Sequence, residues 1–141
     1  MTTAIVISRD HWHAGLAGFM GQPEAQTPRL DALAATSTVF DGHFAEDVAE
    51  TGIGRAWTSG RYGFPLAGRQ GASFPVAEDL KQAGVTVQLV GETAVHWLDS
   101  VECDGVVRVE DGLADVALAS IEEHLSRAPE RSLLWIAAAG P

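Results

Sequence analysis

Residues 76–91, VAEDLKQAGVTVQLVG, contain one helix and one strand in direct succession. The first nine residues have the composition of a short helix, and Gly84 stands where a left-handed residue ends such helices. The residues after Gly84 form an apolar, β-branched run at 85–91, which predicts a buried strand. A helix followed immediately by a buried strand is typical of α/β proteins.

The same alternation extends along the chain. Apolar runs at 3–8, 105–110 and 132–139 predict further strands, and 38–44 suggests a short one. Helices are expected at 27–37, where Thr27 is the N-cap and Pro28 the first helical residue, at 52–60, and at 111–128. We therefore predict one α/β domain over residues 1–141, a three-layer sandwich with a mostly parallel sheet. Functional groups should collect at the carboxyl ends of the strands, where Asp10 and the loop after 38–44 fall.

Composition and charge limit the classes of partner. The chain has 141 residues, is 46% hydrophobic and carries a net charge of −10. This charge argues against nucleic acid and anionic membranes as main partners. No run has the length of a membrane span or a signal peptide, so we expect a cytoplasmic protein. The single cysteine, Cys103, excludes an intramolecular disulfide and a multi-cysteine zinc site.

Residues 51–61, TGIGRAWTSGR, read as a small-residue loop followed by a short helix. Loops of this kind aim a nucleophile and backbone N–H groups at an anion. Thr51 is the candidate nucleophile, although a threonine hydroxyl is weak unless a neighbouring group activates it. Thr51 as an ordinary N-cap of the 52–60 helix explains the pattern equally well.

Five stretches together resemble the N-terminal half of the sulfatase family, in the alkaline phosphatase superfamily. They are AIVISRDHWHAGLAGFMG (4–21), QTPRLDALAATSTVFDGHFA (26–45), TGIGRAWTSGRY (51–62), DLKQAGVTVQLVG (79–91) and ADVALASIEEHLSRAPERSLLWIAA (114–138). The second is the most specific, since it follows the family pattern TPNLDxLAxxGxxFxxxY. The resemblance implies a truncated sulfatase-like core.

The positions that depart from the family pattern include those that supply the family's nucleophile and metal ligands. Thr51 stands where the family has the Cys or Ser that becomes formylglycine, and threonine cannot give that aldehyde. Glu92 and Ala94 stand at the positions of a family lysine and histidine. The family's metal-binding Asp pair is reduced to Asp10 followed by His11, and the sequence ends before the family's remaining ligands.

Asp10 and His11 are the candidate ligands for a divalent cation, calcium or magnesium by the resemblance. Calcium takes about six to eight oxygen ligands, so one carboxylate is not a complete site. The alternative is an Asp10 that caps the following turn. By the same resemblance, Arg55 holds the Thr51 segment or binds an anion.

The first functional hypothesis is therefore a truncated, catalytically inactive sulfatase-like domain. It would bind a small anion such as sulfate or phosphate near Asp10, Thr51 and Arg55, or assemble with a second chain or with itself through an open sheet edge. The alternative is a metal-dependent hydrolase or transferase acting on sulfuric or phosphoric esters. In that case Thr51 is the nucleophile, Arg55 stabilises the oxyanion, and a second chain completes the site. A third possibility is a fragment with no role of its own.

Overall fold

The computed structural model describes residues 2–45, 49–60, 75–101, 103–127 and 130–140. They divide into two compact units, one formed by residues 1–10 and 46–140 and the other by residues 11–45. Each unit is described by itself, and the single-domain organisation stays a prediction. None of the described helices combines the length and the apolar character needed to cross a bilayer.

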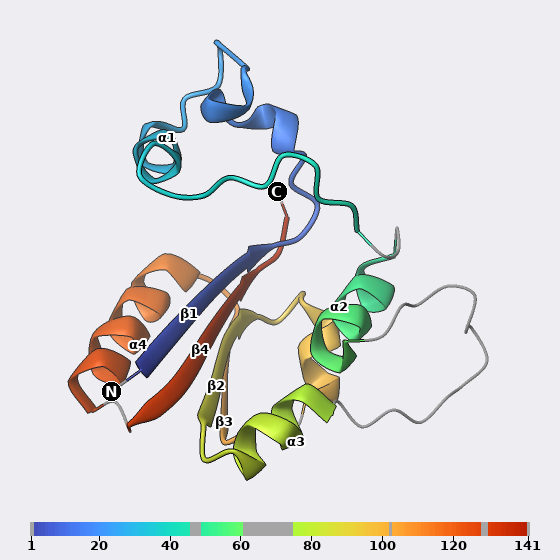
Figure 1. Ribbon diagram of the computed structural model, residues 1–141, viewed down its shortest axis with the longest axis vertical. Coiled ribbons are helices and arrows are strands. Elements are labelled where there is room, and N and C mark those ends of the chain that lie inside the picture. The colour runs from blue at the N-terminus through green and yellow to red at the C-terminus, as the bar shows by residue number, and fades with distance from the viewer. Residues whose placement is uncertain (1, 46–48, 61–74, 102, 128–129, 141) are drawn as a thin grey trace. The chain divides into compact units, whose positions relative to one another are not determined.

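The larger unit is an α/β structure built on a parallel sheet, which confirms the predicted class (Figure 1). Its elements are β1 (Thr2–Arg9), α2 (Glu50–Ser59), α3 (Pro75–Gln82), β2 (Thr86–Glu92), the short 3-10 helix η3 (His96–Ser100), β3 (Gly105–Val109), α4 (Leu113–Arg127) and β4 (Arg131–Ala138). The four strands lie in the order β1-β4-β2-β3, and every neighbouring pair is parallel. Each predicted strand except 38–44 is present, with ends shifted by at most one residue.

Two apolar layers cover the two faces of this sheet. On one face, Val87, Leu89 and Ala137 pack with η3 and with Leu80 of α3. On the other face, Leu134 and Ile136 pack with Ala117 of α4. Figure 1 shows α4 on one side of the sheet and α2 and α3 on the other. The strands β2 and β4 read as continuous apolar runs because both of their faces are buried.

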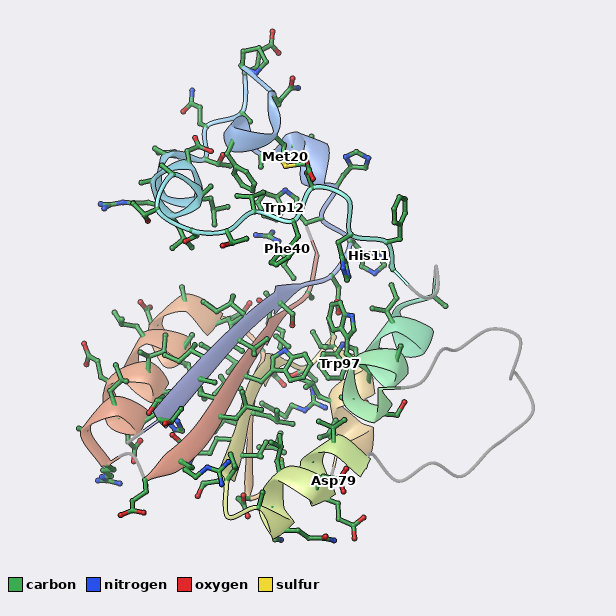
Figure 2. All side chains as sticks on the ribbon, in the orientation of Figure 1. His11, Trp12, Met20, Phe40, Asp79 and Trp97 are labelled. Carbon is green, nitrogen blue, oxygen red and sulfur yellow. The ribbon has the colours of Figure 1, made fainter. Side chains whose placement is uncertain are left out.

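Three tryptophans join α2, η3 and β4 on the first of these faces. Their ring centroids lie 6.3 Å apart for Trp57 and Trp97, 6.1 Å for Trp57 and Trp135, and 5.3 Å for Trp97 and Trp135. Trp97, labelled in Figure 2, lies beside α2 at Gly54, where a Cβ would collide with its ring. The indole N–H of Trp135 donates to the Ser8 hydroxyl at 2.9 Å, which ties β1 to β4 on this face.

The smaller unit contains η1 (Ala14–Leu16), η2 (Gly18–Met20) and α1 (Pro28–Ala34). Pro28 is the first helical residue, as predicted. The strand predicted at 38–44 is wrong: these residues form an irregular segment with a turn at Asp41-Gly42. Asp and Gly favour turns, so they interrupt the apolar alternation that suggested a strand.

Replacing Gly54 by alanine tests the packing of α2 on Trp97. Alanine normally stabilises a helix interior by about 1 kcal/mol relative to glycine. Here we expect Gly54→Ala to lower the free energy of unfolding by about 1–3 kcal/mol, because the methyl group meets the indole ring. Urea denaturation followed by tryptophan fluorescence measures the change. Gly105→Ala is the control, since a Cβ there meets no atom within 4 Å; equal effects of the two substitutions would contradict the packing.

Candidate functional site

The carboxyl edge of the sheet is where a parallel α/β sheet places its functional groups. Two carboxylates flank the end of β4 at this edge. Asp10 follows β1 on one side of β4, and Glu92 ends β2 on the other. The prediction that Asp10 lies at this edge is confirmed, whereas residues 38–44 form no strand.

Asp10 is fixed through its backbone. Its N–H donates to the Ala138 carbonyl at 3.0 Å and so continues the ladder between β1 and β4 by one residue. The side chain is half-buried, and the next residue, His11, is exposed with a left-handed φ of 55°. Within the described parts of the chain, no three His, Cys, Asp or Glu side chains gather to hold a metal ion. A calcium or magnesium ion at Asp10 and His11 therefore stays a prediction.

Glu92 has a structural role that the sequence did not reveal. Its Oε2 accepts a hydrogen bond from the backbone N–H of Ala139 at 2.7 Å, which joins the end of β2 to the residue after β4. Its backbone carbonyl and that of Val95 both accept hydrogen bonds from the Arg108 guanidinium, at 3.2 and 2.9 Å. Glu92 thus links the carboxyl ends of β2 and β4 through its carboxylate.

Thr51 and Arg55 lie inside α2, not on a loop that precedes a helix. The helix begins at Glu50, and the carbonyl of Ala49 accepts the hydrogen bonds from Gly52 and Ile53. The predicted N-cap role of Thr51 is therefore wrong, because Ala49 occupies that position. Burial of Ala56 and contact of Trp57 with the other tryptophans stabilise a helix that the glycines disfavour.

A second polar cluster, formed by Thr27 and Asp31, occupies the smaller unit. Asp31 Oδ1 accepts hydrogen bonds from the Phe19 N–H and from the Thr27 hydroxyl, both at 2.9 Å. The Thr27 oxygen in turn accepts the Gly18 N–H at 2.8 Å. Thr27 occupies the predicted N-cap position, but its hydroxyl makes no cap hydrogen bond. The pair binds the start of η2 to α1, so it is structural.

The side chains of His13 and Cys103 also have local partners. His13 Nδ1 accepts the backbone N–H of Gly15 at 3.1 Å, which uses one of the ring nitrogens available for a metal. The thiol of Cys103 donates to the Gly105 carbonyl at 3.3 Å. Burial, together with the charge of Asp104, raises the pKa of the Cys103 thiol. This thiol is therefore protonated at neutral pH and is a poor nucleophile.

Substitution of Glu92 tests its role at the sheet edge. Glu92→Lys removes the acceptor of the Ala139 N–H, so we expect the free energy of unfolding to fall by about 1–3 kcal/mol. Glu92→Gln keeps an acceptor oxygen and should cost clearly less. Chemical denaturation of both variants measures this difference, and a lysine variant as stable as the glutamine variant would show that the hydrogen bond contributes nothing.

In comparisons with known proteins, no family model, no curated protein and no solved structure matches this chain.

Proposed function

We propose that this chain is a sulfatase-like α/β domain that acts in protein assembly, through the open edge of its sheet at β1. One observation carries the proposal. The apolar side chains of Ile5, Val6 and Ile7 are 40%, 36% and 71% exposed, although they lie in the middle of a strand of a parallel sheet. Full burial of such side chains is worth about 1.5–3 kcal/mol each, so a partner that covers them gains affinity.

Both faces of β1 are apolar. Ile5 and Ile7 pair with Leu134 and Ile136 of β4 and so share the face that α4 covers. Val6 pairs with Trp135 and lies on the opposite face. A strand with apolar side chains on both faces is typical of a sheet interior. Within the described residues β1 nevertheless stands at the edge.

The outer edge of β1 offers backbone hydrogen-bonding groups to another strand. The N–H groups of Thr2 and Asp10 donate to β4 or to the residue that precedes it, at 2.8 and 3.0 Å. Because alternate residues of a parallel strand bond to the same neighbour, Ile5 and Ile7 direct their N–H and C=O groups away from β4. An extended segment of another polypeptide can pair with these groups, as in β-strand addition.

Two substitutions in β1 test this proposal. Ile5→Pro removes an outward N–H without removing a bond to β4, and Ile7→Lys places a charge on the edge while keeping every N–H. In sedimentation-velocity experiments over a concentration series, with no other protein present to occupy β1, we expect the unmodified chain to self-associate weakly through this edge at high concentration. Either substitution should weaken that association by about tenfold or more, with the circular dichroism spectrum unchanged.

The opposite edge of the sheet provides the matched control. Val106 of β3 is 45% exposed, and the carbonyl of Val109 accepts a hydrogen bond from the N–H of Thr93 after β2. By the same alternation Val107 and Val109 bond to β2 and the Val106 N–H points outward, so Val106→Pro makes an equivalent change at the other edge. It should leave association unchanged. A folded Ile7→Lys variant that associates like the unmodified chain would refute assembly through β1.

A further inference from the structure

The exposed residues Ile5 and Ile7 of β1 lie on the sheet face that α4 covers, and one flank of α4 is also apolar and exposed. Ala117 and His124 are the buried residues of α4, and they face the sheet. Leu118 and Leu125 are 57% and 50% exposed, and they lie seven residues apart on the same side of the helix. An isolated exposed leucine is unremarkable, but two on one flank form an apolar stripe.

The cavities beside α4 show which way this flank points. Ser120 and Glu123 line a cavity of about 120 Å³ together with Gln88 of β2 and Val107 of β3, so their flank lies over β2 and β3. Leu118 and Leu125 are on the other flank and therefore point toward the side of β4 and β1. The helix α4 contacts β4, which is the neighbour of β1 in the sheet. We use the name β1–α4 notch for the step between the exposed sheet face at Ile5 and Ile7, its floor, and the exposed flank of α4 at Leu118 and Leu125, its wall.

Standard packing distances place one helix over the notch. Helices pack about 8–10 Å apart, and strands in a sheet lie about 4.8 Å apart. A partner helix packed against the Leu118 flank of α4 would thus lie about two strand spacings from α4, on the side of β1. Since α4 contacts β2 and β4, such a helix would lie over β1 and the next strand outward. A partner strand that paired with β1 without such a helix would leave the apolar side chains of the floor and the wall exposed.

A second copy of this chain does not fill the notch. In a symmetric dimer with paired β1 strands, the two α4 helices would lie on the same face, about four strand spacings or ~19 Å apart. This separation leaves room for one more helix between them. Each copy also carries a net charge of −10, which opposes association of two copies at long range.

The acidic residues that border the notch favour a partner with positive charge at that border. Asp115 and Glu122 are exposed and alternate with Leu118 and Leu125 at spacings of three and four residues. They therefore adjoin the apolar wall on its solvent side. A helix with an apolar face and basic residues along one border matches the wall and the rim together.

We propose that the β1–α4 notch binds an amphipathic helix with a basic flank, presented by a different protein whose strand pairs with β1. This inference rests on the proposed assembly function and adds the chemistry of the partner. The helix contributes contact with Ile5, Ile7, Leu118 and Leu125, and its basic residues approach Asp115 and Glu122.

A synthetic helix is a suitable probe. The probe is a fluorescein-labelled peptide of about 18 residues, with leucines at i, i+3, i+4 and i+7 spacing and lysines at the other positions. One control peptide has glutamate in place of each lysine, and another has the same composition in alternating order. In anisotropy titrations of the full chain, we expect the basic helical peptide to bind at least tenfold more tightly than either control.

Variants in α4 locate the binding site. Leu118→Gln with Leu125→Gln should weaken binding of the basic peptide by about tenfold or more. The matched control, Ala119→Gln with Ser126→Gln, changes two exposed residues with the same spacing on the solvent side of α4 and should leave binding unchanged. Asp115→Asn with Glu122→Gln should weaken binding several-fold and reduce its dependence on salt.

The outcomes separate this inference from the proposed function. Equal binding to the leucine variant and to its matched control, or equal binding of the acidic peptide, would overturn the helix site. Self-association that still responds to Ile7→Lys would then leave assembly through β1 intact. Self-association that does not respond to Ile7→Lys would remove the basis of both.

Discussion

A strand of a parallel sheet has to be covered on both faces, and this constraint organises the larger unit. For β2 and β4 it is satisfied by α4 on one face and by α2, α3 and η3 on the other. The tryptophans complete one of these layers because they are large enough to span from α2 to β4. For β1 the constraint is not satisfied by the described residues, and its apolar side chains remain exposed.

Much of the fold could be predicted from the sequence because apolar runs are a strong signal when both faces of a strand are buried. The segments at 85–91 and 132–139 correspond to β2 and β4, and 111–128 corresponds to α4. The error at 38–44 shows the limit of that signal, since a short alternation containing Asp41-Gly42 is equally compatible with a turn. For α2, the decisive contacts come from Trp97, more than 35 residues away, and propensity alone favoured a later start.

The polar positions were harder to interpret. Glu92 and Asp31 are both used in hydrogen bonds to the backbone. A sequence pattern reports the residue type but not its partner, and the partner of Glu92 is separated from it by 47 residues. The alternative roles of Asp10 as a metal ligand or a structural residue likewise depend on distant neighbours that spacing does not specify. Only the placement of Asp10 at the sheet edge followed from the order of the elements.

Charge and apolar area act at different ranges around the β1–α4 notch. The net charge of −10 acts over about the Debye length of 8 Å at physiological ionic strength, before any surfaces touch. It slows the approach of other copies and of acidic proteins, and it accelerates the approach of basic ones. The isoleucines of β1 and the leucines of α4 contribute only after contact, and they do not distinguish the charge of a partner. A chain that needs a hydrophobic edge can therefore keep it exposed with less risk of self-association if its overall charge selects the partner first.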